Sequence, residues 1–307
     1  MANKQPQRIK TISEFHRLNN LEKPEHPLVS VIDFESIRHL PTDGSISFTR
    51  DFYSIGLKKN FNAKMKYGQQ QYDFDEGIMT FMAPGQVLRI EAQNEETVKH
   101  SGWLLLFHPD FLLHTSLAKA IKQYQYFSYA VNEALHLSAK EEAVIVGIIR
   151  NVEQEYRSAI DHFSQDVIIA QLELLMTYAE RFYHRQFITR KVSNHQILSR
   201  LDDVLNDYLN SEVLAKQGLP TVGYIAEKLH LSPSYLSGML KTLTGQSTQH
   251  LLYDKLMEIA KERLSTTSLT VSEIAYELGF DHSQSFSRLF KNKTNLSPLD
   301  FRKTFNS

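Results

Sequence analysis

Close to the end of the chain, polar and basic side chains recur on one side of a predicted short helix. They share the spacing of an outward helical face and comprise Ser283, Gln284, Ser287, Arg288 and Lys291. An arginine guanidinium makes a bidentate contact with a guanine edge in DNA, and a glutamine amide makes the matching contact with adenine. A lysine holds a phosphate. The pattern predicts a helix that contacts DNA bases through Arg288 and Gln284, with the two small serines allowing close approach and Lys291 on a phosphate.

Two of these residues also have structural roles open to them. Asp281 and Asp300 offer Arg288 ion-pair partners within the same region. Gln284 is able to cap its own helix through the backbone N–H of Asp281. In either alternative the side chain is held by the protein itself and is not available to contact DNA.

Capping and turn residues define the elements that position this face. Thr270 and Glu273 form a capping box that begins one helix, and Gly279 allows the turn after it. Asp281, with Gln284 three residues later, is the predicted start of the next helix. Apolar residues three and four positions apart predict the buried side of the pair: Ile274, Ala275, Leu278, Phe286, Leu289 and Phe290. Residues 270–295 are therefore predicted to form one helix-turn-helix unit.

A looser copy of this unit spans residues 221–245. Thr221 caps its first helix, Ser232-Pro233 begins its second, and Gly245 supplies a left-handed stop. The apolar positions repeat at an offset of 49 residues before the turn and 50 after it. In its second helix, Ser234 and Ser237 are the predicted base contacts and Lys241 is the predicted phosphate contact.

One amphipathic helix is predicted between the two units, at residues 248–265. At about 1.5 Å per residue it is about 27 Å long. That length, once helix width is added, is close to the roughly 34 Å between successive major-groove faces of a duplex. A single polypeptide is thus predicted to present two reading helices to one face of DNA.

Two motifs complete the pattern from Leu201 to the end of the chain. The second unit and the residues after it contain Gly279-Phe280, Ser283, Phe286-Ser287-Arg288-Leu289-Phe290-Lys291, Ser297-Pro298 and Phe301-Arg302. The first unit contains Ser232-Pro233-Ser234-Tyr235-Leu236-Ser237. These residues resemble the C-terminal signature of the AraC/XylS transcription regulators. The resemblance implies a helical domain with both reading helices in the major groove, fused to a cupin-like sensing or dimerising domain, and contact with RNA polymerase.

The chain departs from the family's pattern at two positions. Asn295 stands where the family usually has glycine after the second reading helix, and asparagine is the residue that next best tolerates the left-handed conformation. Gly238 stands where many members have a basic residue in the first reading helix. We therefore expect the second unit to carry most of the base recognition and the first mainly to position the DNA backbone.

Residues 26–135 show short apolar runs separated by turn residues, after a polar arm at residues 1–25 with a short helix at Ile12 to Leu18. This spacing predicts a small antiparallel barrel or sandwich, which is compatible with the cupin-like domain that the resemblance implies. The aromatic residues of this segment either line a pocket for a small organic effector or simply fill the core. They are Phe52, Tyr67, Phe74, Phe81 and Trp103.

Two amphipathic helices are predicted in residues 136–184. Ser138 and Glu141 form a capping box, and the first helix carries Val144, Ile145, Ile148, Val152 and Tyr156 on one side. The second begins at Ser164. The pair either packs within the chain or forms a homodimer interface. Residues 185–194 are polar and basic and are the predicted linker to the DNA-binding domain at 195–307.

Composition excludes several classes of function. The formal net charge of the 307 residues is -1, so any DNA contact must come from a local surface. From Thr221 onward, ten basic minus eight acidic side chains leave a net charge of +2. The chain has no cysteine, which excludes thiolate chemistry and fits a reducing compartment. It shows no paired metal-ligating histidines and no phosphate-binding glycine loop, so we expect no metal, no cofactor and no catalytic site.

The predicted fold class is α+β and multidomain. It comprises an N-terminal cupin-like β-barrel with two packing or dimerisation helices and an all-α double helix-turn-helix domain. The predicted function is a cytoplasmic, dimeric, effector-responsive regulator that binds double-stranded DNA. One alternative is a cupin-like enzyme or small-molecule binder with a helical tail for protein interaction. Another is a regulator without an effector, controlled by its amount or by a protein partner.

Overall fold

The chain folds into two units. The computed structural model describes residues 6–37, 45–59, 66–67, 70–71, 77–91, 101–130, 133–159, 161–189 and 191–304. The first unit spans Met1–Gln186 and the second spans Phe187–Ser307. This boundary falls inside the segment predicted as a linker. That segment is helical over its described residues, because α4 (Ser164–Thr189) runs through it and α5 (Lys191–Leu209) follows.

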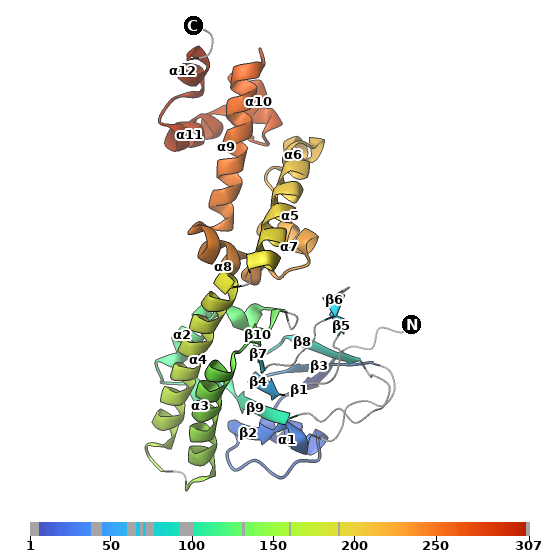
Figure 1. The fold of residues 1–307 in the computed structure, drawn as a ribbon, viewed down its shortest axis with the longest axis vertical. Coiled ribbons are helices and arrows are strands. Elements are labelled where there is room, and N and C mark those ends of the chain that lie inside the picture. The colour runs from blue at the N-terminus through green and yellow to red at the C-terminus, as the bar shows by residue number, and fades with distance from the viewer. Residues whose placement is uncertain are drawn as a thin grey trace. The chain divides into compact units, whose positions relative to one another are not determined.

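Two β-sheets form the body of the first unit (Figure 1). One has five strands in the order β10-β7-β4-β9-β2, and the other has three in the order β1-β3-β8. Their strands are β1 (Gln7–Ile9), β2 (Val29–Asp33), β3 (Ser45–Arg50), β4 (Tyr53–Lys59), β7 (Ile78–Met82), β8 (Val87–Glu91), β9 (Ser101–Phe107) and β10 (Leu135–His136). A separate hairpin joins β5 (Lys66–Tyr67) to β6 (Gln70–Gln71). Within the described ranges the two larger sheets share no hydrogen-bonded strand, so the predicted closed barrel is not observed there.

The segment predicted as an N-terminal arm is part of the first unit over its described residues. Strand β1 pairs in parallel with β3. The short helix α1 (Ile12–Leu18) has the predicted bounds and is capped by the Thr11 side chain. Ile12 and Phe15 are buried and join the core between the sheets, because the apolar face of a short helix needs such a partner.

The five-stranded sheet buries both of its faces, against different partners. Leu104 and Leu106 of β9 face the core that contains Phe52. Residues of β9 at the alternate positions point to the opposite face, and there Trp103 pairs with Leu57 of β4. The helices cover this second face, which explains the nearly continuous apolar run of β9.

Two long helices lie in the first unit, α3 (Ala139–Arg157) and α4. The predicted capping box at the start of α3 is confirmed, with hydrogen bonds between Ser138 and Glu141 in both directions. The predicted buried stripe is confirmed except at Val144, which is 38% exposed. The period places Ile145 and Ile148 inward and rotates Val144 outward.

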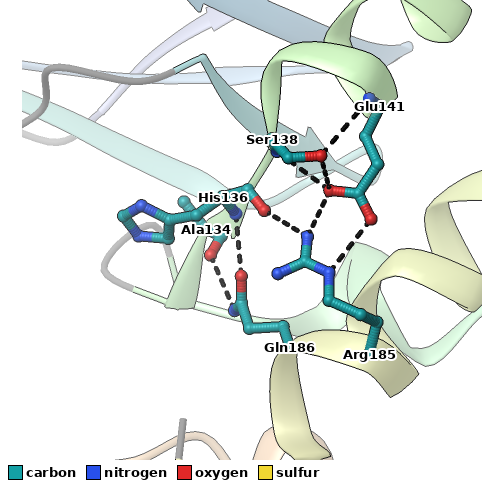
Figure 2. A network of polar contacts seen from close by, with 6 residues as sticks. All are labelled: Ala134, His136, Ser138, Glu141, Arg185 and Gln186. Atoms are coloured by element: carbon teal, nitrogen blue, oxygen red, sulfur yellow. Dashed lines mark hydrogen bonds and ion pairs between the residues drawn. The ribbon is translucent and has the colours of Figure 1, made fainter. Parts of the chain in front are cut away.

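A polar network fixes the end of α4 to β10 and to the start of α3 (Figure 2). Arg185 donates to the two Glu141 carboxylate oxygens at 3.0 and 2.7 Å and to the carbonyl of His136 at 2.7 Å. The buried Gln186 side chain accepts from the His136 backbone N–H at 2.8 Å and donates to the Ala134 carbonyl at 3.2 Å. Arg185, which the sequence places in the predicted linker, is therefore an internal contact of the first unit.

The second unit is helical over its described residues. After α5 it contains α6 (Glu212–Gln217), α7 (Val222–Leu229), α8 (Pro233–Thr244), α9 (Thr248–Thr266), α10 (Val271–Glu277), α11 (Ser283–Thr294) and α12 (Pro298–Lys303). Helix α9 confirms the helix predicted between the repeated units, and its 19 residues give a length of about 28 Å. It contacts α8 on one side of the repeat and α10, α11 and α12 on the other (Figure 1).

Candidate nucleic-acid interface

The first helix pair is α7 and α8, and its caps are those predicted from the sequence. The Thr221 and Ser232 side chains accept hydrogen bonds from the backbone N–H groups of Tyr224 and Tyr235. Gly245 ends α8 in the left-handed conformation with φ 74°. The turn between the helices contains His230, also left-handed with φ 58°. No glycine marks this turn in the sequence, and histidine is among the few other residues enriched in that conformation.

The second helix pair is α10 and α11. Thr270 and Glu273 form the predicted capping box, and the two hydrogen bonds from Thr270 lower the pKa of Glu273. Gly279 has φ 77° in the turn. An added Cβ there would lie 2.5 Å from the Leu214 carbonyl oxygen and 2.9 Å from the Gly218 Cα. Only glycine satisfies both the left-handed backbone and this close approach.

The start of α11 differs from the prediction. The N-cap is His282 and not Asp281, and its side chain makes no capping hydrogen bond. His282 aligns with Ser232 at the offset of 50, so the extra residue of the second helix pair lies in its turn. Because no side chain closes this end, the first backbone N–H groups of α11 keep their capacity for an anion.

Aromatic packing sets the rotation of α11. Phe286 and Phe290 are fully buried, and their rings lie 5.5 and 5.4 Å from those of Phe280 and Phe301. Leu289, which the sequence predicted to be buried, is half-buried. With these rings inward, the predicted reading face of α11 turns away from the core.

The predicted reading residues are available on that face. Gln284 and Arg288 are exposed, and Ser283 and Ser287 are half-buried. Across the described residues, Arg288 forms no ion pair and Gln284 forms no hydrogen bond. Neither of the structural alternatives considered from the sequence is present: Asp300 contacts Ser297 and Lys303, and Gln284 caps nothing.

Helix α8 presents a weaker face. Ser234 is half-buried, and Ser237 is half-buried and accepts a hydrogen bond from Thr248 of α9 at 3.5 Å. Lys241 is exposed. Ser237, one of the two predicted base contacts of α8, is therefore held by the neighbouring helix, and Gly238 has no side chain to offer a base.

Several basic residues of this unit are used for internal contacts that the sequence did not indicate. Lys293 donates to Asp254 at 2.7 Å, which joins α11 to α9. Arg263 pairs with Glu277 at 2.6 Å, which joins α9 to α10. Lys291 is exposed and has no such partner among the described residues. The positive charge available for phosphates is thus smaller than the residue count suggests.

An open surface depression of about 420 Å³ lies beside the start of α11. Its lining includes Tyr276, His282, Ser283 and Gln284. Tyr276 is 69% exposed, which is unusual for an aromatic side chain in a small helical unit. Tyr276 is not among the residues predicted from the sequence, although its outward position on α10, two residues after the buried Ile274, is a signal for it.

The aromatic residues predicted to line an effector pocket do not meet at one place in the described part of the chain. Phe52 lies in the core between the two sheets. Phe81 and Trp103 lie on the opposite face of the five-stranded sheet, toward the helices. Phe74 and the side chain of Tyr67 lie outside the described residues. The described ranges also contain no group of three residues suited to hold a metal ion.

Two capped helix pairs joined by α9 define a tandem helix-turn-helix domain. Residues 225–304 match the family model of a helix-turn-helix domain. Over 122 residues the chain is 30% identical to an uncharacterized HTH-type transcriptional regulator, YobQ of Bacillus subtilis (strain 168), covering 40% of this chain and 47% of that protein. Over 84 residues it is 39% identical to the raffinose operon transcriptional regulatory protein RafR of Pediococcus pentosaceus, covering 27% and 30%.

A third relative is the uncharacterized HTH-type transcriptional regulator in the cgkA 5' region of Pseudoalteromonas carrageenovora. The two sequences are 30% identical over 117 residues, which cover 38% of this chain and 64% of that protein. The chain thus spans less than two thirds of each of these relatives. A similar solved structure is the C-terminal domain of the two-component response regulator yesN from Fusobacterium nucleatum, with 34% identity, coverage of 33% and 96%, and a TM-score of 0.29.

The C-terminal unit is accordingly a helix-turn-helix domain of the AraC type, which confirms the resemblance carried by its motifs. The relatives named above are transcriptional regulators and not enzymes. Along the described residues, no helix is both long and apolar enough to cross a membrane.

Proposed function

We propose that this protein is a transcription regulator that binds double-stranded DNA through both helix-turn-helix units and recognises sequence mainly through α11. The observation that carries the proposal is Arg288. It is exposed on the outward face of a helix whose other side is locked by buried aromatic rings, and it forms no ion pair across the described residues. A guanidinium left free in this way is suited to a bidentate contact with guanine.

The proposed roles of the other residues follow from their exposure. Gln284 contacts adenine, and Ser283 and Ser287 allow the helix to approach the groove closely. Lys241 and Lys291 hold phosphates, together with the uncapped start of α11.

The first helix pair, α7 and α8, is proposed to act mainly as an anchor. Ser234 and Ser237 of α8 are its base contacts, but the hydrogen bond of Ser237 to Thr248 leaves little of that side chain for a base. Tyr276, beside the start of α11, is proposed as a further backbone contact through its hydroxyl group.

The first unit is proposed to be a cupin-like sensing domain that forms a homodimer through α3 and α4. Val144 of α3 and Val167 and Leu174 of α4 are 38%, 40% and 44% exposed. A hydrogen bond between Asn151 and Gln171 shows that the outer faces of the two helices lie side by side. An exposed apolar face of this kind supports burial against a second copy. The proposal also includes contact with RNA polymerase and a cytoplasmic location.

Genome-wide mapping of the DNA bound by the full chain supplies the site for a direct test. On that site, Arg288→Ala is expected to lose about 1–3 kcal/mol of discrimination against random DNA. Lys241→Ala should weaken binding to both DNAs about equally, since a phosphate contact carries no sequence information. Arg17→Ala, at an exposed arginine of α1, is the matched control and should change neither affinity. Equal losses on both DNAs for Arg288→Ala would remove the base-reading role.

A further inference from the structure

A single carboxylate on α9 contacts both helix pairs of the second unit. Asp254 lies in the first half of α9 and is half-buried. Its Oδ1 accepts a hydrogen bond from the Lys293 Nζ of α11 at 2.7 Å. Its Oδ2 accepts from the side-chain amide of Gln246 at 3.3 Å, and Gln246 belongs to the turn that joins α8 to α9. Asp254 is therefore bonded at once to the end of the first helix pair and to the reading helix of the second.

The rotation of α11 directs Lys293 to this carboxylate. Lys293 follows the buried Phe290 by three residues, so it lies next to the side of α11 that packs inward, whereas Lys291 is exposed. Its Nζ also lies 2.8 Å from the His250 Nε2 of α9. An ammonium group only donates, so this nitrogen accepts and the ring proton of His250 is assigned to Nδ1. Two acceptors of α9 thus hold a side chain that is only 21% exposed.

The apolar contacts of α9 fix the relative position of the helices less sharply than this polar link does. Leu252 and Leu256 are buried along α9, and hydrophobic burial has no preferred direction. A hydrogen bond between ionised groups is short and depends on its angle. Because the two oxygens of Asp254 bind opposite partners, the carboxylate opposes both rotation and sliding of α11 relative to the turn after α8.

We propose that Asp254 sets the distance and rotation between the reading helices α8 and α11, and thereby the spacing of DNA contacts that the protein accepts. Each added base pair moves the next contact by about 3.4 Å along the duplex and turns it by about 35°. Reading helices that are held rigidly match one spacing and lose contacts on others. Asp254 is thus a positioning residue that determines specificity without touching a base, and this inference rests on the proposed function.

The first test compares the affinity of the full chain for two DNAs. One carries the mapped site, and the other has one base pair inserted between the segments that footprinting assigns to the two helix pairs. The parent protein should bind the longer site about tenfold more weakly. Asp254→Asn and Lys293→Met should each reduce this ratio to about twofold, because the second helix pair is then able to follow the shifted contacts.

Two controls belong to this comparison. Lys293→Arg keeps a cation beside Asp254 and should retain the tenfold ratio. Glu258→Ala removes an ion pair with Lys255 at 3.4 Å that lies wholly within α9, and it should also leave the ratio unchanged. A general effect of charge on DNA affinity cancels in the ratio, since it acts on both DNAs alike.

The second test needs no DNA. The chain has no cysteine, so Lys241→Cys and Lys291→Cys place one spin label on α8 and one on α11, at exposed positions. Double electron–electron resonance on the full chain, diluted with unlabelled chain, then gives the distribution of distances between the labels. A narrow distribution is expected in the labelled parent and with Glu258→Ala. Asp254→Asn and Lys293→Met should both broaden it.

Three results would overturn the inference: an unchanged affinity ratio in a folded Asp254→Asn or Lys293→Met variant, an equally narrow distance distribution in these variants, or the same changes in Glu258→Ala. The two tests separate this inference from the proposed function. Normal binding to the mapped site with an unchanged ratio refutes the positioning role alone. A chain that binds no DNA refutes the regulator, and the spin-label distances then decide whether Asp254 holds the two helices.

Discussion

Substitution of Gly279 by alanine tests how the turn of the second helix pair is held. The left-handed backbone alone costs a residue with a Cβ about 1–2 kcal/mol, part of which is offset by the lower entropy of the unfolded alanine chain. The new methyl group would also lie 2.5 Å from the Leu214 carbonyl oxygen. Backbone atoms cannot move aside as a side chain does, so overpacking adds about 1–3 kcal/mol. The expected loss is about 2–4 kcal/mol.

Gly245→Ala is the matched control for this substitution. Gly245 has nearly the same φ, 74° against 77°, but an added Cβ there meets no atom within 4 Å. It should lose about 1 kcal/mol from the backbone term alone. The difference between the two variants therefore isolates the clash with Leu214.

Urea unfolding followed by far-ultraviolet circular dichroism measures both variants. The chain has one tryptophan, Trp103, so its fluorescence reports the first unit and serves as an internal reference. Gly279→Ala should lower the dichroism midpoint by about 1 M or more and leave the fluorescence transition unchanged. Equal losses in Gly279→Ala and Gly245→Ala would refute the role of the close approach.

Three further substitutions have defined outcomes. His230→Gly should stabilise the second unit by about 1 kcal/mol at most, because it relieves a left-handed backbone; a lower urea midpoint would contradict this. Arg185→Met should lower the free energy of unfolding of the first unit, measured by fluorescence, by about 1–3 kcal/mol, because it leaves Glu141 unpaired. Lys216→Met is the contrast: it removes an exposed ion pair with Glu212 and should cost less than about 1 kcal/mol. Burial lowers the pKa of His16, so stability is retained above its ordinary value of about 6.5 and lost as the pH falls below it; unfolding at two pH values should show a smaller change in His16→Gln.

The second unit could be predicted almost completely from the sequence, because its signals are local. Caps, proline positions and a three-and-four apolar period act over a few residues, and Thr270 with Glu273 or Ser232 with Pro233 determine helix ends wherever they occur. The reading face of α11 followed from the same period once Phe286 and Phe290 were taken as buried. The exception is the start of α11, where the backbone of the turn places His282 at the cap without a local signal.

The first unit was predictable only in outline. The alternation of side chains along β4 and β9 indicated strands. It did not indicate which face of the five-stranded sheet packs against the helices and which packs against the other sheet. Consequently Phe52 and Trp103 were assigned to one pocket although they lie on opposite faces. The contacts of Arg50 with Phe15 and Ser54 were also hidden, since these residues come from different elements.

The sequence by itself determined the helix-turn-helix repeats, the helix between them and the outward position of Arg288, because each depends on hydrogen bonds and periodicity within a single helix or turn. The tertiary structure decided which cations are free. Lys293 and Arg185 form ion pairs with residues 39 and 44 positions away, whereas Arg288 is exposed and forms no ion pair among the described residues. Charge pairing acts through space between distant segments, so no local pattern in the chain records it.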